Sequence, residues 1–356
     1  MHPLRLLSAA EQVALHLSGE LERGRWSGTI PGVHFLAAEL GVNRKTIEAS
    51  LRLLEQEGRL VGQGAGRKRM IQPSGNTVRA RGLKVGILPA EQADLHLSYL
   101  VELQHALVEA GHRIAFSGKS LLELGMNVDN IRRSIGRIEA DAWILLAASR
   151  EVLEWFSNQK VPAFALFGFQ QGLPIAGIKL DKPNAYVAAV RNLIELGHKR
   201  IVIISRRMGG SPEPRVSEEA ALSELRRHGI KTGDYNLPIW EETPEGLQKL
   251  LGSLFRLTPP TAMIIDEAPL FAATQQFLAN QGLRVPQQVS LICTDPDPTF
   301  SWCIQSVAHI YWDSGPFVRR VVRWAANVSR GKIDTRQSMV AAKFMPGGTI
   351  GRAIAD

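Results

Sequence analysis

The sequence has few cysteines, no long apolar run and no hydrophobic leader. Only Cys293 and Cys303 occur among its 356 residues, so a disulfide framework is excluded and a reducing compartment is expected. The longest apolar stretches, such as Trp143 to Ala148, have the length of a strand and fall short of the roughly 18 residues of a membrane span. Glu11 interrupts the mildly apolar start, which argues against a secretory signal. These absences predict a cytoplasmic protein without membrane contact.

The motifs of several enzyme classes are also missing. The triplet Gly118 to Ser120 looks like the end of a phosphate-binding loop, but Arg113 stands where that loop needs its first glycine. The nine histidines form no metal-binding pair with a carboxylate, and no Gly-x-Ser-x-Gly elbow is present. His198 is interpreted as a residue that packs or caps at a helix–strand turn. We therefore expect no enzymatic activity, no metal and no cofactor.

The composition is that of a globular protein with an uneven charge distribution. Hydrophobic residues make up 45% and charged residues 21% of the chain, and its length favours about two domains. Residues 1–82 contain 12 Lys and Arg against 7 Asp and Glu, whereas the remaining residues contain 30 against 27. Six basic and no acidic residues lie between Arg59 and Arg81. This asymmetry predicts a module at the N-terminal end that binds a polyanion.

The spacing of apolar residues predicts three helices in this module. They are expected over 4–21, with Ser8 and Glu11 as a capping box, over 31–40, and over 44–57. The short turn at Gly41 between the second and third helices is typical of a helix-turn-helix motif, whose second helix enters the major groove of DNA. Two short strands around the glycine-rich residues 62–66 would then form a hairpin, or wing. Residues 1–72 are thus predicted to fold as a winged helix-turn-helix domain of the α+β class.

Residues 10–71 resemble the winged helix of GntR-type transcription regulators. The matching stretches are IP at 30–31, LAAELGV at 36–42, RKT at 44–46 and LEQEG at 54–58. Gly32 and His34 replace a Ser and an Arg that the family usually carries, and Asn43 replaces a common Ser. The resemblance implies DNA binding, although a winged helix can also serve protein contacts. The candidate DNA-binding residues are His34, Asn43, Arg44, Lys45, Thr46, Arg67, Lys68 and Arg69.

A second domain is predicted beyond a polar linker at 73–82. Apolar strand-sized runs alternate with amphipathic stretches, a pattern that indicates parallel sheets covered on both faces. Two α/β lobes are expected in residues 83–356, the first over about 83–176 plus 310–330 and the second over about 178–308. The expected strands are 83–88, 114–116, 142–146, 163–167, 201–204, 262–265, 289–293 and 307–310.

Residues 83–350 resemble the effector-binding domain of LacI-type regulators, which is similar to periplasmic sugar-binding proteins. The supporting stretches include LGHKRI at 196–201, AALSELR at 220–226, IDEA at 265–268, GLRVP at 282–286 and VSLI at 289–292. The first lobe matches less well, because residues 89–98 lack the family's usual polar ligand contact. Glu91, Asp94 and His96 are possible substitutes there. The resemblance implies a two-lobed periplasmic-binding-protein-like α/β domain.

Ligands of such domains bind at the carboxyl ends of the parallel strands. Arg215, Asp266 and Asp295 fall at such ends and match the family's ligand-contact positions, and their donors and acceptors suit a sugar. Ser149 and Phe167 follow strands of the first lobe and are the candidates there. Each of the first three also has a structural interpretation: a surface pair with Glu218, a helix cap and a turn, respectively.

The sequence as a whole predicts a ligand-responsive transcription regulator. We expect a homodimeric repressor whose partners are a double-stranded DNA operator and a small-molecule effector, most simply a sugar. An activator, or a regulator that senses a nucleobase or another metabolite, is the alternative. A solute-binding transport protein fits less well, because it would need a signal peptide and would have no winged helix.

Overall fold

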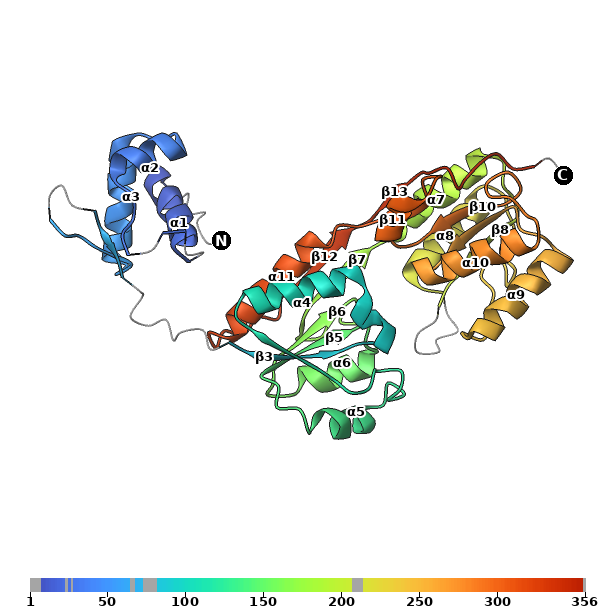
Figure 1. Ribbon diagram of the computed structural model, residues 1–356, viewed down its shortest axis with the longest axis horizontal. Coiled ribbons are helices and arrows are strands. Elements are labelled where there is room, and N and C mark those ends of the chain that lie inside the picture. Colours follow the sequence, from blue (N-terminus) through green and yellow to red (C-terminus); the bar gives the residue numbers. More distant parts are fainter. Residues whose placement is uncertain are drawn as a thin grey trace. The chain divides into compact units, whose positions relative to one another are not determined.

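The computed structural model describes residues 8–22, 25–26, 28–64, 68–72, 82–206 and 214–354. The chain divides into two compact units, Met1–Arg81 and Gly82–Asp356, and each is described by itself (Figure 1). Within the described ranges, no helix combines the length and the apolar character that a membrane crossing requires.

The described residues of the first unit form three helices followed by a two-stranded antiparallel hairpin. Thr29 forms an isolated antiparallel bridge with Met70 of the hairpin. Eight buried hydrophobic residues from all three helices, the segment before α2 and the hairpin make its core. The elements are α1 (Ala9–Glu22), α2 (Val33–Leu40), α3 (Arg44–Gln56), β1 (Leu60–Val61) and β2 (Met70–Ile71).

The ends of α2 and α3 follow from local chemistry. Gly41 has a φ of 65° and ends α2, a left-handed conformation that glycine adopts without a Cβ clash. Asn43 then begins α3, because its side chain accepts a hydrogen bond from the backbone N of Thr46 at 2.8 Å. The helices lie where apolar spacing predicts them, and the expected start of the first, residues 4–7, lies outside the described residues.

The second unit contains two sheets, as predicted for a two-lobed α/β domain. The first sheet has the order β12-β7-β6-β5-β3-β4 and all its strands are parallel. The second has the order β13-β11-β10-β9-β8, and only β13 runs antiparallel. The strands are β3 (Lys84–Leu88), β4 (Arg113–Phe116), β5 (Ala142–Leu146), β6 (Ala163–Leu166), β7 (Ala176–Asp181), β8 (Ile201–Ile204), β9 (Ala262–Ile265), β10 (Ser290–Cys293), β11 (Ala308–Tyr311), β12 (Gln337–Ala341) and β13 (Lys343–Met345).

Helices cover both faces of each sheet, because alternate strand residues point to opposite faces. In the first lobe, Ile144 belongs to the core under α4 and α11, while Leu145 belongs to the core under α5 and α6. In the second lobe, α7 and α8 cover one face and α9 and α10 the other. The helices are α4 (Ser98–Glu109), α5 (Val128–Ile135), α6 (Arg150–Ser157), α7 (Pro183–Glu195), α8 (Val216–Arg227), α9 (Pro244–Leu257), α10 (Ala268–Asn280) and α11 (Gly315–Val328), with short 3₁₀ turns η1 (Gln92–His96) and η2 (Pro298–Trp302).

The chain passes between the lobes at three places, and the lobe boundaries differ from those expected. Strand β7 stays in the first sheet as far as Asp181, beyond the division expected at 176–178. Strand β11 belongs wholly to the second sheet, although residues from 310 onward are expected in the first lobe. The third passage is short: only Ala342 separates β12, in the first sheet, from β13, in the second.

Candidate functional site

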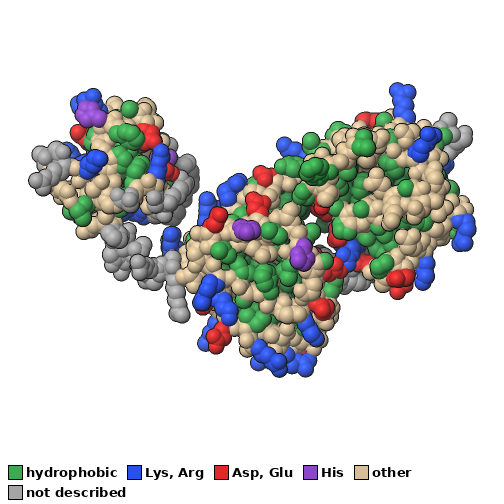
Figure 2. Space-filling model, in the orientation of Figure 1, with side chains coloured by type: hydrophobic (Ala, Val, Ile, Leu, Met, Phe, Trp, Pro, Cys, Tyr) green, Lys and Arg blue, Asp and Glu red, His purple; other side chains and the backbone are tan. Residues whose placement is uncertain are grey.

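Charged side chains follow several of the parallel strands at the point where each strand ends. Lys182 comes directly after β7, Arg206 two residues after β8, Asp266 directly after β9 and Asp295 two residues after β10. Carboxyl ends of parallel strands lie along one edge of a sheet, which is where ligands of open α/β folds bind. Figure 2 shows acidic and basic side chains where the surface is hollowed between the two lobes.

Asp266 is buried and tied to three groups of the second lobe. Its carboxylate accepts hydrogen bonds from Thr294 Oγ1 at 2.6 Å and from the backbone N of Arg206 at 3.3 Å, and it lies 3.5 Å from a guanidinium nitrogen of Arg215. Burial alone would raise the pKa of Asp266, but the charges of Arg215 and Lys182 hold that pKa below its ordinary value. Asp266 does not act as a side-chain cap of α10, whose N-cap residue is Glu267.

Asp295 joins two of the segments that pass between the lobes. Its Oδ1 accepts hydrogen bonds from Lys182 Nζ at 2.7 Å and from the indole nitrogen of Trp312 at 3.1 Å. Lys182 follows β7 and Trp312 follows β11. The sequence does not single out either side chain. A search of every strand end would have found Lys182 had Ala176–Asp181 been recognised as a strand.

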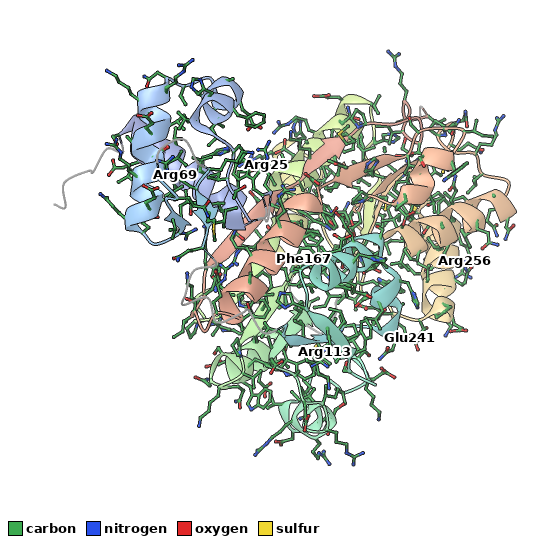
Figure 3. The ribbon with its side chains drawn as sticks, turned by 60° about the vertical axis from the view of Figure 1, so that its left-hand side comes forward. Arg25, Arg69, Arg113, Phe167, Glu241 and Arg256 are labelled. Atoms are coloured by element: carbon green, nitrogen blue, oxygen red, sulfur yellow. The ribbon has the colours of Figure 1, made fainter. Side chains whose placement is uncertain are left out.

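An aromatic cluster lies next to Asp295. Phe167 has a φ of 62° directly after β6 and lies between α4 and α11 (Figure 3). Its ring centroid is 5.8 Å from that of Tyr99, 5.7 Å from that of Trp312 and 5.5 Å from that of Phe317. Trp312 also donates a hydrogen bond to Asp295. The ring contact with Trp312 therefore links Phe167 to the charged cluster, which consists of Lys182, Arg206, Arg215, Asp266 and Asp295.

The residues expected to contact an effector do not all lie close to one another. Arg215 precedes α8, with its side chain 3.5 Å from Asp266 and 3.9 Å from Glu218. The pair with Glu218 exists, but Glu218 is buried, so it is not the expected surface pair. Ser149 instead begins α6, where its hydroxyl accepts from the backbone N of Val152 at 3.4 Å. Among the described residues, no hydrogen bond joins the Ser149 side chain to the charged cluster.

An ion pair between Arg206 and Glu91 spans the two lobes. Arg206, after β8, forms a two-pronged contact with Glu91, after β3, and one of its two hydrogen bonds measures 3.0 Å. Glu267 and Glu242 lie 3.4 and 3.6 Å from the same guanidinium. Burial raises the pKa of Glu267 to about 7; the Asp266 carboxylate acts in the same direction and Arg206 opposes it. Glu91, expected only as a substitute ligand contact, is thus engaged by Arg206.

In the first unit, the candidate DNA-binding residues fall into two groups. His34, Arg44, Lys45 and Lys68 are exposed. Asn43 is also exposed, but its Oδ1 accepts hydrogen bonds from the backbone N and from Oγ1 of Thr46, which is partly buried. Arg69 lies against α3 and pairs with Glu55 at 2.7 Å (Figure 3). Arg67 lies outside the described residues.

The described part of the chain contains no candidate metal site. There, no three or more His, Cys, Asp or Glu side chains are placed to hold a metal ion. His198 is buried, and its ring nitrogens lie 3.0 Å from Thr261 Oγ1 and 2.9 Å from the carbonyl oxygen of Gly351. Its interpretation as a packing residue at a helix–strand turn is confirmed.

Comparison with known proteins identifies the class of fold. Residues 190–350 match the sequence profile of the periplasmic binding protein-like domain, and the two lobes described above have the α/β architecture of that class. No curated protein sequence gives a significant match.

Solved structures with this fold include several regulators. The Escherichia coli transcriptional repressor ascG is 17% identical with a TM-score of 0.58, over 75% of this chain and 99% of that one. A LacI family transcriptional regulator from Bifidobacterium animalis subsp. lactis is 19% identical with a TM-score of 0.61, over 77% and 99%. The transcriptional regulator CelR in complex with cellobiose is 16% identical with a TM-score of 0.60, over 90% and 100%. At these identities the likeness establishes the fold.

Proposed function

We propose that this chain is a ligand-responsive transcription regulator and not an enzyme. Its first unit is a GntR-type winged helix that binds a DNA operator, and its second unit senses a small molecule, most simply a sugar. One observation carries the proposal: a helix whose exposed face begins with Arg44 and Lys45 occurs in the same chain as a two-lobed α/β fold. The proteins of similar fold include a transcriptional repressor and a regulator solved with cellobiose.

The first unit supports the DNA-binding half of the proposal. Three helices, an antiparallel hairpin and the bridge from Thr29 to Met70 are the elements of a winged helix. Arg44, Lys45 and Lys68 are exposed, and no ion pair occupies them among the described residues. They are therefore available to phosphates and base edges. Asn43, Thr46 and Arg69 support the surface indirectly, through the cap of α3 and the hairpin.

The cleft supports the sensing half. Asp266 and Asp295 supply acceptors for hydroxyl groups, Lys182 and Arg215 supply donors, and the rings of Phe167 and Trp312 lie beside them. Such a mixture of paired polar groups and aromatic faces suits a polyol ring. A ligand that contacts both lobes favours one arrangement of the lobes and thereby changes DNA affinity.

DNA binding is tested by anisotropy of the full chain on duplex DNA over a range of salt concentrations. Lys68→Ala should lower the slope of log K against log salt by about one and weaken all sequences alike. Arg44→Ala should reduce the preference for the operator over random duplex. Binding that is unchanged in both variants contradicts the assignment.

Sensing is tested by thermal shift with a panel of sugars and nucleobases, because a ligand that binds only the native state raises the Tm. Asp266→Asn should weaken the responding ligand about ten- to a hundredfold. Asp129→Asn, on the exposed face of α5, is the matched control. Unchanged affinity in Asp266→Asn would place the ligand elsewhere.

We further propose a cytoplasmic homodimer that acts as a repressor on paired half-sites, because a lone winged helix buries little DNA surface. Light scattering of the full chain at micromolar concentration should give twice the monomer mass, and a monomer mass would reject this part of the proposal.

A further inference from the structure

The solvent face of α3 carries one carboxylate among three cations. Ile47, Ser50, Leu51 and Leu54 are buried against the rest of the first unit, so the opposite face is open. The residues exposed on α3 are Arg44, Lys45, Glu48, Ala49, Arg52 and Gln56. Glu48 is four residues from Arg44, three from Lys45 and four from Arg52, so all three cations are its neighbours on the helix surface.

Glu48 is not held by these neighbours. Ion pairs shorter than 4.0 Å tie Glu55 to Arg69 and Glu57 to Arg59, whereas none involves Glu48 among the residues described for this unit. Its carboxylate extends from the second turn of the helix that would enter the groove. A negative charge there opposes binding to the phosphate backbone, since it repels the polyanion that the flanking cations attract.

A carboxylate in the major groove pairs best with cytosine, because the other base donor, the N6 amine of adenine, lies beside the N7 acceptor, which repels a carboxylate. It can only accept hydrogen bonds, and the exocyclic amine of cytosine is the donor that Asp and Glu typically read there. Asn43 and Thr46 are already bonded to each other at the start of α3. The exposed charged side chains on the first two turns of α3 are Arg44, Lys45 and Glu48.

From this arrangement we infer that Glu48 is a specificity-determining residue that reads a cytosine in each half-site. The inference rests on the proposed DNA-binding function and adds a named base to it. Arg44, Lys45 and Arg52 attract DNA of any sequence, while Glu48 penalises sequences that offer no donor at its position. The carboxylate thus lowers affinity for random DNA and raises the contrast between operator and background.

The test is selection of duplexes from a randomised pool by the full-length chain and by its variants. The wild type should enrich one position per half-site for cytosine, with a discrimination of about 5- to 150-fold. Glu48→Ala should lose discrimination at that position alone, retain it elsewhere, and bind random duplex more tightly. Glu48→Gln should move the preference from cytosine toward adenine, because the amide offers both a donor and an acceptor.

Glu57→Ala is the matched control, since Glu57 is exposed just beyond the far end of the same helix and its loss should leave every preference unchanged. Equal Tm values of all variants establish that they fold. If Glu48→Ala and Glu48→Gln keep the wild-type preference at every position, Glu48 does not read a base and the inference fails. It fails equally if the position that relaxes does not prefer cytosine. A wild-type chain that enriches no sequence overturns the proposed function instead.

Discussion

Asp295 binds two side chains that are far from it in sequence. Lys182 lies 113 residues before it and Trp312 17 residues after it, and each belongs to a segment that passes between the lobes. The carboxylate therefore fixes the local geometry of two of the three connections. Asp295 thus has a structural role in the second unit, and it is also a candidate for ligand contact.

Replacement of Lys182 by Met should expose the cost of this carboxylate. The variant leaves Asp295, whose side chain is 24% exposed, with the indole donor of Trp312 and a long contact of 3.5 Å from Thr294 Oγ1. We expect the free energy of unfolding to fall by about 1–3 kcal/mol, the usual cost of losing a partner of a charged group. Urea denaturation measures the change. The double variant with Asp295→Asn should recover part of the loss, and an unchanged single variant would show that the pair contributes nothing.

Glu267 gives the cleft a pH dependence whose sign can be stated. Burial raises its pKa to about 7, and Asp266 and Asp295 add to the shift while Arg206 opposes it. Between about pH 4.5 and 7, Glu267 is protonated in the folded state and ionised in the unfolded state. The contribution of Glu267 to the free energy of unfolding therefore falls as pH rises through that range. Glu267→Gln should raise the Tm at about pH 8 and leave it unchanged near about pH 4.5. A lower Tm at the higher pH would mean that the pair with Arg206 outweighs burial.

Part of the charged cluster could be predicted residue by residue. Asp266 and Asp295 follow continuous apolar strands, and such strands are recognisable from hydrophobicity alone. Lys182 follows a strand whose partly exposed half, Lys179 to Asp181, is largely polar, and Trp312 gains its meaning only from the partner that the fold brings to it. Arg206 and Glu91 meet through lobe packing, which no local pattern encodes.

At the scale of elements, α3 depends on its first turn. Its outward face is charged and its inward face supplies four buried residues, and Asn43 satisfies a backbone N–H group of the first turn. Asn43 Oδ1 bonds both the backbone and the hydroxyl of Thr46.

Asn43→Ala should destabilise the first unit by about 1 kcal/mol through the loss of this cap. Amide hydrogen exchange of residues 44–56 in the full chain measures the effect. Lys45→Ala, which removes an exposed side chain from the same turn, is the control and should leave exchange unchanged. Equal exchange in both variants would contradict a capping role.

The strands that hydrophobicity does not reveal are edge strands or carry a polar half. Strand β12 alternates exposed and covered residues, and β13 has three residues, of which two are exposed. An edge strand needs one partner and little apolar surface, so its sequence resembles that of a loop. By contrast, β5, β8 and β9 are buried throughout, and their ends agree with those predicted.

At the scale of the whole second unit, the ion pair of Arg206 and Glu91 joins the two lobes. Glu91→Gln should favour open arrangements by about 1–3 kcal/mol, because it weakens a charged, two-pronged contact at partly buried side chains. Spin labels at Glu151→Cys and Lys249→Cys, in a Cys303→Ser background, report the distance between the lobes. We expect a longer and broader distribution in Glu91→Gln. Glu109→Gln, on the exposed face of α4, should match the unsubstituted chain, and an identical distribution in Glu91→Gln would show that other contacts set the closure.

The short passage at Ala342 also affects when each sheet can be completed during synthesis. Strands β12 and β13 are the last of their respective sheets to emerge from the ribosome, and each forms an edge of its sheet. Neither lobe can be completed until residues 337–345 have been made, whereas the first unit has all its described elements by residue 72. A stop codon shortly before residue 337 would therefore leave two unfinished sheets beside an intact N-terminal module. Such a product would keep the exposed face of α3 while exposing two strand edges to aggregation.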